Sequence, residues 1–263
     1  MGNTLRKRAI VGAVTGALAL TTFVAPAAQA DNITSGNTKI SNVVVNGGKS
    51  VVVGVTSKKT VKLKFTVTDN SGVWRAAAFL YRGSSTANMD TAAPSSGTWI
   101  KCTKVSSTKA TCSASYTIEA GSNAFNAHAG TWKTWAIAQG KDADYIEREN
   151  IKSFKVLRAA QLAGANAAPE PVAKGATVTV TSRLTRASWD AGRNASFGAQ
   201  SVQLQFKAKG ASAYKTVKTV KSAATGDLKT TVKATVDGTY RYVFAGTSTT
   251  AGATATGDTI DVK

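Results

Sequence analysis

The sequence is poor in the residues that most catalytic and metal centres need. Among 263 residues it has one histidine, His128, and two cysteines, Cys102 and Cys112. A zinc centre needs three or four clustered nitrogen, sulfur or oxygen ligands, which this set does not supply once the cysteines pair. The sequence also lacks the Gly-x-Ser-x-Gly turn that presents a nucleophilic serine. We therefore expect a protein without catalytic activity; an enzyme with an unrecognised site is the weaker alternative.

Long apolar runs are also missing, except close to the N-terminus. The basic stretch Arg6–Arg8 precedes an apolar segment over residues 9–20, and Ala28-Gln29-Ala30 has the small-x-small pattern of a cleavage site. This arrangement is typical of a secretory signal peptide, and the apolar segment is too short to span a bilayer. We expect residues 1–30 to be removed and the mature chain to be extracellular, without a transmembrane segment.

Helix-favouring residues are scarce, whereas threonine, valine, alanine and serine are abundant, so the composition favours strands. Short runs alternate apolar and polar residues, as in Val61–Thr68 and Val202–Lys207, which is the pattern of a half-buried strand. Turn-forming stretches such as Asp69-Asn70-Ser71-Gly72 separate these runs. Two longer segments, Gly83–Gly97 and Ala187–Gln200, are expected to be loops.

The strand pattern occurs in two halves, separated by an Ala-rich stretch that ends in Pro169-Glu170-Pro171. Proline restricts both itself and the residue before it, so this stretch should be extended. Many short strands with regular turn signals are typical of antiparallel sandwiches. We predict an all-β protein with one sandwich over residues 31–160, a linker over residues 161–173 and a second sandwich over residues 174–263.

The charge is strongly one-sided, with 33 Lys and Arg against 14 Asp and Glu and a formal net charge of +19. Both halves of the chain share the excess, which suits anionic partners such as cell-wall polymers. The lysines mostly alternate with apolar residues along strands, as Lys62 and Lys64 do, so solvated strand faces that protect sheet edges explain them equally well. Nucleic acid and acidic lipid head groups are other anionic partners, but no specific nucleic-acid motif accompanies the charge, and charge alone does not establish nucleic-acid binding.

The two cysteines lie in a segment that is predicted to be a hairpin. Trp99–Ile118 has two strand-like runs on either side of Ser106-Ser107-Thr108, and pairing Val105 with Lys109 places Cys102 opposite Cys112. An even number of cysteines in an exported chain is most simply a disulfide. The short ring that it closes contributes about 2–3 kcal/mol in the chain-entropy model. No CxxC motif indicates a redox role.

One segment is rich in carboxylates, and it contains Asp142, Asp144, Glu147 and Glu149. Calcium prefers about six to eight hard oxygen ligands, often from several loops. Asp69 and Asn70 could join Asp142 and Asp144 only if their turns share one end of the sandwich. These four residues form a candidate calcium site, and local salt bridges are the alternative interpretation. No other cofactor is expected.

The five tryptophans are Trp74, Trp99, Trp132, Trp135 and Trp189. Exposed indoles could form a carbohydrate-binding platform, although burial in a sandwich core is the commoner fate of tryptophan. On a regular strand, Trp132 and Trp135 point to opposite faces of the sheet.

Motifs in the second half resemble a bacterial immunoglobulin-like module: Gly175-x-x-Val178-x-Val180, Gln200-x-Val202-x-Leu204-x-Phe206, Gly226-x-Leu228, and Gly238-x-Tyr240-Arg241-x-x-Phe244-Ala245-Gly246-Thr247. Thr68–Val73 resembles a turn that is common in such domains. The whole order of segments is similar to that of small exported streptomycete proteins. This resemblance implies tandem immunoglobulin-like domains in a secreted binding or structural protein. It implies no mechanism, although some members of the family carry a calcium-binding name.

Overall fold

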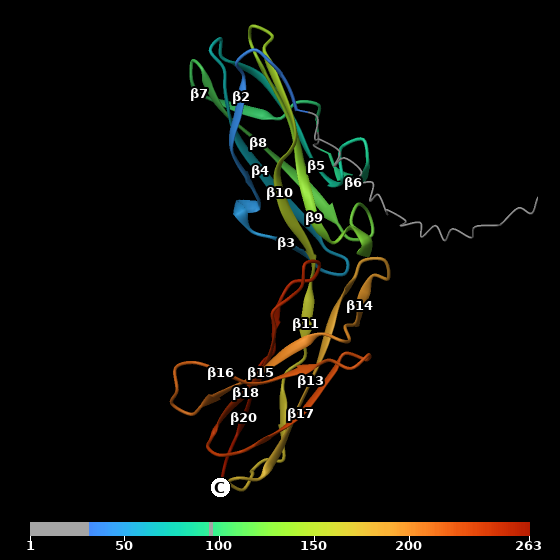
Figure 1. Cartoon of the computed structure of the whole chain (residues 1–263), viewed down its shortest axis with the longest axis vertical. Coiled ribbons are helices and arrows are strands. Elements are labelled where there is room, and N and C mark those ends of the chain that lie inside the picture. Colours follow the sequence, from blue (N-terminus) through green and yellow to red (C-terminus); the bar gives the residue numbers. More distant parts are fainter. Residues whose placement is uncertain (1–31, 95–96) are drawn as a thin grey trace, which may run out of the picture.

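A computed structural model describes residues 32–94 and 97–263 (Figure 1). The predicted signal peptide lies outside these residues. Within them the chain forms strands and two single-turn 3-10 segments, η1 (Asn46–Gly48) and η2 (Asn126–His128). No helix in this part of the chain is long and apolar enough to cross a membrane. The all-β prediction is therefore confirmed.

The first domain is a sandwich of two sheets. Its strands are β1 (Asn32–Ser35), β2 (Lys39–Val45), β3 (Val51–Val53), β4 (Lys58–Thr68), β5 (Val73–Gly83), β6 (Met89–Ala93), β7 (Lys101–Ser106), β8 (Lys109–Glu119), β9 (Gly130–Gly140) and β10 (Tyr145–Arg158). One sheet has the order β2-β4-β8-β7 and the other β1-β10-β9-β5-β6, with β3 running parallel to β10. All other pairs in the two sheets are antiparallel.

This strand order is that of an immunoglobulin domain. If β2 and β3 are the two parts of strand A, and β4 to β10 are strands B, C, C′, D, E, F and G, the two sheets are A-B-E-D and G-F-C-C′, with β1 added beside strand G. This is the immunoglobulin arrangement. The short strand β3 is then the second part of strand A, which crosses from one sheet to the other. Antibody domains have a disulfide between strands B and F, whereas here the disulfide joins the strands that correspond to D and E.

The core of the first domain lies between the two sheets. Leu63 and Phe65 of β4 are fully buried, while Lys62 and Lys64 between them are exposed, as the alternation predicts. Trp132 of β9 is fully buried in this core. The hydroxyl of Tyr116 on β8 donates to the carbonyl of Ala78 on β5 at 2.9 Å, so a buried hydrogen bond joins the sheets.

The second domain is a second immunoglobulin-like sandwich. Its strands are β11 (Ala160–Leu162), β12 (Asn166–Ala168), β13 (Thr177–Ser188), β14 (Arg193–Ser196), β15 (Ser201–Ala208), β16 (Lys215–Lys221), β17 (Asp227–Lys233), β18 (Gly238–Phe244), β19 (Ala253–Thr254) and β20 (Asp258–Ile260). The long strand β13 pairs with β11, β12, β14 and β17, and β16-β15-β18 with β19 and β20 forms the facing layer. Tyr242 of β18 repeats the role of Tyr116, because its hydroxyl donates to the carbonyl of Val180 on β13 at 2.8 Å.

The structure corrects three details of the sequence prediction. Residues 161–173, predicted to be a linker, include parts of the second domain, because β11 and β12 pair with β13. The loops expected at Gly83–Gly97 and Ala187–Gln200 contain the short strands β6 and β14. In the cysteine hairpin Lys109 pairs with Ser106 rather than Val105, which bulges out, while Cys102 still lies opposite Cys112. Short polar edge strands give little periodic signal, which explains the missed pairings.

The two domains are joined end to end (Figure 1). Trp189 of the second domain belongs to the hydrophobic core of the first. Only Ala159 separates β10 from β11. Trp189 follows β13 directly, is 2% exposed and belongs to the hydrophobic core of the first domain. Its indole Nε1 donates to the carbonyl of Val53 at 3.1 Å. The core of the first domain is therefore completed by a side chain from the second.

Polar contacts surround this inserted tryptophan. The Asn126 side chain accepts from the Trp189 backbone N–H at 2.9 Å and donates to Ser188 Oγ at 3.1 Å. The backbone N–H of Asn126 donates to the Asp190 carboxylate at 2.8 Å. On the other side of the junction, Arg158 is buried and its Nε donates to the Ala187 carbonyl at 2.6 Å. These contacts fix the second domain against the first.

Candidate functional sites

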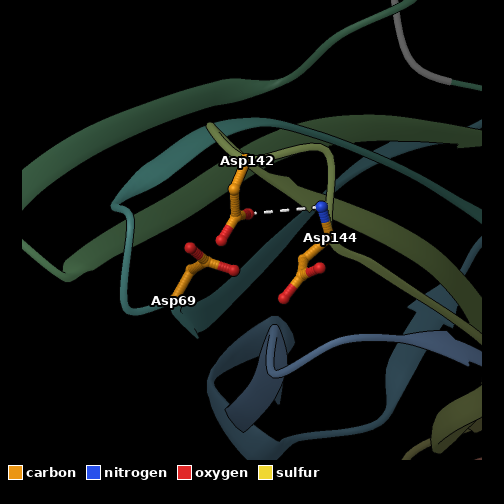
Figure 2. Close-up of side chains that lie close together, drawn as sticks. All are labelled: Asp69, Asp142 and Asp144. Atoms are coloured by element: carbon orange, nitrogen blue, oxygen red, sulfur yellow. Dashed lines mark hydrogen bonds between the residues drawn. The ribbon is translucent and has the colours of Figure 1, made fainter.

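Three aspartates meet at one end of the first domain (Figure 2). Asp69 follows β4, and Asp142 and Asp144 lie in the turn between β9 and β10. One carboxylate oxygen of each lies within 4.8 Å of the others. The two turns therefore share an end of the sandwich, which is the condition that the sequence set for a calcium site. Asn70 also lies there, with its backbone N–H donating to the Asn37 side chain at 3.1 Å.

Protein donors already serve these carboxylates. Asp69 accepts from the backbone N–H of Ser71 at 2.9 Å, from the Ser71 hydroxyl and from the Thr38 hydroxyl. Asp144 accepts from the backbone and side-chain nitrogens of Asn37 at 2.8 and 3.0 Å. The cluster thus ties the start of β2 to both turns. Hydrogen bonding to the charged form stabilises the carboxylates of Asp69 and Asp144, and the Asp142 carboxylate accepts from the backbone N–H of Asp144 at 3.3 Å.

Two glycines make room for this arrangement. A Cβ at Gly140 would lie 2.3 Å from the Asp69 carboxylate, and one at Gly36 would lie 1.8 Å from that of Asp144. Gly36 also has a φ of +78°, a conformation that costs little only for glycine. Both close approaches are packing features of the folded chain, so the sequence pattern alone did not reveal them.

Asp69 should make the first domain sensitive to acid. Burial acts to raise the pKa of Asp69, but hydrogen bonds from Ser71 and Thr38 outweigh it and hold the pKa below its usual value. A carboxyl with a depressed pKa stabilises the fold above its unfolded-state pKa and loses that contribution as pH falls through the folded-state pKa. We expect Asp69→Asn to lower the melting temperature at pH 7 and to flatten its fall below about pH 4.

Melting curves between pH 2.5 and 7 measure this difference, and an unchanged pH profile would contradict it. The same melts with millimolar calcium or with chelator separate hydrogen bonding from metal binding. We expect the midpoint of the wild-type protein to be the same in both. A midpoint that calcium raises, and that Asp142→Asn returns to the chelator value, would make the cluster a calcium site.

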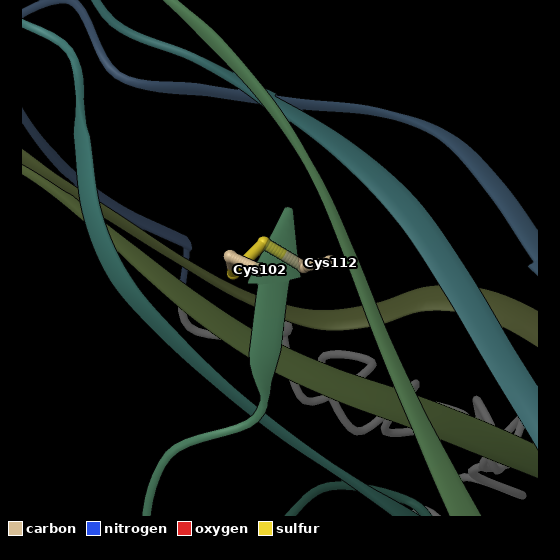
Figure 3. The surroundings of a disulfide bond; sticks show 2 residues. All are labelled: Cys102 and Cys112. Atoms are coloured by element: carbon tan, nitrogen blue, oxygen red, sulfur yellow. A yellow bond between two sulfur atoms is a disulfide. The ribbon is translucent and has the colours of Figure 1, made fainter. Parts of the chain in front are cut away.

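The predicted disulfide is present (Figure 3). Cys102 of β7 and Cys112 of β8 are directly paired across the hairpin, and no described cysteine is free. Cys112 is fully buried in the core of the first domain. The bond therefore fastens the edge strand β7 to the interior of its sheet.

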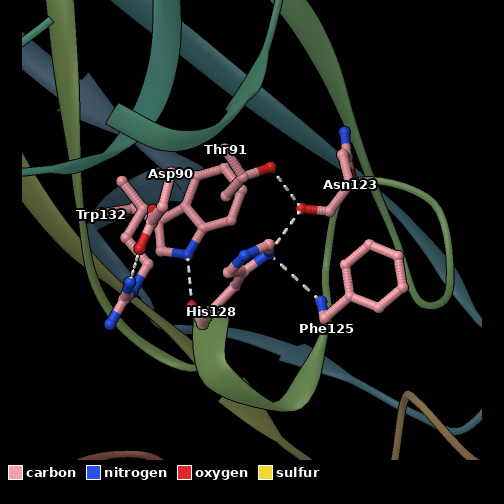
Figure 4. A network of polar contacts seen from close by, with 7 residues as sticks. Asp90, Thr91, Asn123, Phe125, His128 and Trp132 are labelled. Carbon is pink, nitrogen blue, oxygen red and sulfur yellow. Dashed lines mark hydrogen bonds and ion pairs between the residues drawn. The ribbon is translucent and has the colours of Figure 1, made fainter. Parts of the chain in front are cut away.

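His128 organises the turn before β9 (Figure 4). Its Nδ1 accepts from the backbone N–H of Phe125 and lies 3.3 Å from the carbonyl of Asn123. Its own carbonyl accepts from the indole Nε1 of Trp132 at 2.8 Å. Burial lowers the pKa of His128, which favours the neutral imidazole. The polar partners of this ring are backbone groups, as expected of a turn histidine.

The outer face of the β2-β4-β8-β7 sheet is basic. Lys64 of β4 and Lys101 of β7 both pair with Ser113 of the intervening β8, so the three residues form a row across three strands. Lys62 pairs with Ser115 in the next row. These residues line a shallow hollow of about 560 Å³ that also contains Val44 and Gly47. Among the described residues, no carboxylate lies within ion-pair distance of the three lysines.

The tryptophans divide between core and surface. Trp132 and Trp189 are buried, and Trp135 is half-buried on the face of β9 opposite to Trp132, as the strand period predicts. Trp74 and Trp99 are 57% and 43% exposed. The guanidinium carbon of Arg75 lies 3.8 Å from the Trp74 ring centroid and 3.9 Å from that of Trp99.

Comparisons with known proteins give fold likeness only. No family model matches the chain, and no curated protein matches it. Dimeric latent PorU from Porphyromonas gingivalis is 12% identical over 86% of this chain, with a TM-score of 0.29, and this chain spans only 20% of it. A marsupial T cell receptor is 10% identical, with 86% of this chain and 73% of that chain covered and a TM-score of 0.37. The D00-D0 domain of intimin is 14% identical, with 84% and 99% covered and a TM-score of 0.29. At these scores the immunoglobulin assignment rests on strand order.

Proposed function

We propose that this protein is a non-catalytic extracellular binding protein that associates with anionic polymers of the cell wall. The observation that carries the proposal is the basic outer face of the β2-β4-β8-β7 sheet, where Lys62, Lys64 and Lys101 surround Ser113 and Ser115. The signal-like N-terminus supports an extracellular location. The disulfide supports it too, because such bonds persist in oxidising compartments.

The arrangement of these lysines favours binding over a merely solvated face. Lysines on β4 and β7 approach the same serine of β8 from both sides. Neighbouring strands lie about 4.8 Å apart, so Lys64 and Lys101 start about 10 Å from each other, and at low salt their like charges still repel one another across this serine. A polyanion would relieve that repulsion and would accept hydrogen bonds from the serine hydroxyls. Without carboxylate partners, the ammonium groups are available to such a ligand.

Co-sedimentation with purified cell-wall fractions tests the proposal. We expect strong binding at low salt that weakens as the Debye length falls from about 30 Å at 10 mM to about 10 Å at 100 mM salt. Replacing Lys62, Lys64 and Lys101 by glutamine should weaken low-salt binding at least about tenfold, because a basic residue near an anionic surface contributes about 1 kcal/mol.

The matched control replaces Lys215, Lys218 and Lys229 of the second domain by glutamine. These lysines are also exposed, so the net charge changes equally. We expect the control variant to lose much less affinity. Equal losses of affinity in the two variants would assign binding to net charge rather than to this sheet face. Absence of wild-type binding at low salt would contradict the proposal.

Calcium binding is the alternative function. The observation in its favour is the approach of Asp69, Asp142 and Asp144 to within 4.8 Å of one another. The hydrogen bonds from Asn37, Thr38 and Ser71 weigh against it, because they already serve two of the three carboxylates, those of Asp69 and Asp144. The melts with calcium and chelator described above distinguish the two functions.

A further inference from the structure

A second basic hollow lies beside Trp74, and its lining differs from that of the basic sheet face. It has a volume of about 90 Å³. Three segments surround it: β5 contributes Trp74, the β7-β8 hairpin contributes Lys104 and Lys109, and the β9-β10 turn contributes Lys141. Ser107 at the tip of the hairpin lines it as well. An exposed aromatic ring is thus placed next to three exposed cations.

The three cations of this hollow are not neutralised. Among the described residues, none of these lysines forms an ion pair with a carboxylate. Lys141 is held by its backbone N–H, which donates to the Gly72 carbonyl at 2.9 Å and to Ser71 Oγ at 3.0 Å. The neighbouring Asp142 points toward Asp69 and Asp144 instead (Figure 2). The hollow is therefore lined by three lysines that have no carboxylate partner among the described residues.

The aromatic wall is held in position. Arg75 contacts both exposed indoles, and its Nε donates to the side chain of Gln139 at 2.9 Å. Contacts of an arginine with aromatic rings are attractive. Arg75 lies over one face of the Trp74 ring, and the residue is still 57% exposed, so a ligand would stack on the opposite face. Cys102 of the disulfide lines the hollow, so the crosslink also fixes the hairpin that carries Lys104 and Lys109. Such fixed geometry reduces the entropy lost on binding.

We propose that this hollow binds an acidic saccharide, with the pyranose ring stacked on Trp74 and the carboxylate of the sugar among Lys104, Lys109 and Lys141. Its volume corresponds to about three water molecules, which suits one acidic group rather than a whole sugar. The ring then lies outside, where the indole is exposed. A second copy of the chain is a poorer occupant, because docking two such surfaces brings like charges together.

Binding of three polymers distinguishes the contribution of the pyranose ring from that of the carboxylate. Polygalacturonate has both pyranose rings and carboxylates, polyglutamate has carboxylates without rings, and a neutral galactan has rings without carboxylates. We expect the protein to bind polygalacturonate more tightly than either of the others at 150 mM salt. Trp74→Ala should weaken polygalacturonate binding by about tenfold, the loss of one aromatic stacking contact, and leave polyglutamate binding unchanged.

Further variants complete the test. Trp74→Phe should restore part of the affinity, and the triple variant Lys104→Gln, Lys109→Gln, Lys141→Gln should lose polygalacturonate binding. Phe125→Ala removes another exposed aromatic side chain of the first domain and should bind as the wild type does. Saturating polygalacturonate should reduce acrylamide quenching of tryptophan fluorescence in the wild type and have little effect in Trp74→Ala. Thermal melts verify that each variant is folded.

Two results would overturn the inference. One is equal affinity for polygalacturonate and polyglutamate, and the other is full polygalacturonate binding by folded Trp74→Ala. Neither decides the proposed function, which depends on Lys62, Lys64 and Lys101 and on cell-wall fractions. Conversely, loss of cell-wall binding with retained, Trp74-dependent polygalacturonate binding would reject the proposed function and support this site.

Discussion

Replacing Trp189 by alanine is expected to lower the free energy of unfolding by about 3–5 kcal/mol, the range for removal of a buried tryptophan or phenylalanine. The side chain is almost completely buried and packs in the core of the first domain. Its loss leaves a cavity there and removes the hydrogen bond to the Val53 carbonyl. Because Trp189 belongs to the second domain, we also expect the two domains to unfold separately in the variant.

Urea unfolding followed by circular dichroism measures both effects. The wild type should unfold in one transition, and Trp189→Ala should give an earlier transition for the first domain and a later one for the second. Trp189→Phe keeps most of the apolar volume and loses only the indole donor, so it should be affected less. Trp74→Ala is the control, because it removes an indole from the surface. A single transition with an unchanged midpoint in Trp189→Ala would show that the domains are coupled by other contacts.

Loss of the disulfide is expected to cost about 2–3 kcal/mol of stability, because the unfolded chain regains the freedom of the closed ring. The variant with Cys102→Ala and Cys112→Ala should therefore melt at a lower temperature. Since Cys112 is buried, part of this loss could come from the smaller side chain. Wild-type protein reduced with dithiothreitol keeps both sulfur atoms and isolates the effect of the crosslink.

Reduction of the disulfide should also loosen the wall of the hollow beside Trp74, because Cys102 lines this hollow. We expect reduced protein to bind polygalacturonate more weakly than oxidised protein at a temperature where both are folded. Equal melting temperatures of the oxidised and reduced wild type would contradict the stabilising role. Alkylation with a mass tag, which should label neither cysteine before reduction and both after it, verifies the redox state.

The sequence was informative where one strand or one hairpin decides the outcome. The alternation of Leu63 and Phe65 with Lys62 and Lys64 predicted which face of β4 is buried, and strand pairing alone predicted the Cys102–Cys112 bond. Both depend on residues that are near neighbours along the chain or across one turn. Successive residues of a strand point to opposite faces of the sheet, so the spacing of three residues also predicted that Trp132 and Trp135 lie on opposite faces.

Contacts between distant segments could not be predicted in this way. That Asp69 meets Asp142 and Asp144 depends on which strands neighbour each other in the sheets, and periodicity does not specify this order. Likewise, Trp189 lies in a segment that the sequence predicts to be a loop, and only the joining of the two domains places it in the core of the first. The Ala-rich stretch before Pro169 was interpreted as a linker because its short paired strands have no clear alternation.

The insertion of Trp189 also sets an order of events during synthesis. Domains usually begin to fold from the N-terminus as the chain emerges. Here all strands of the first domain emerge before Trp189, so we expect that domain to keep a gap in its core until the start of the second domain has followed. During this interval we expect the chain to expose apolar surface. A gene fragment that stops at residue 160 would make that state permanent.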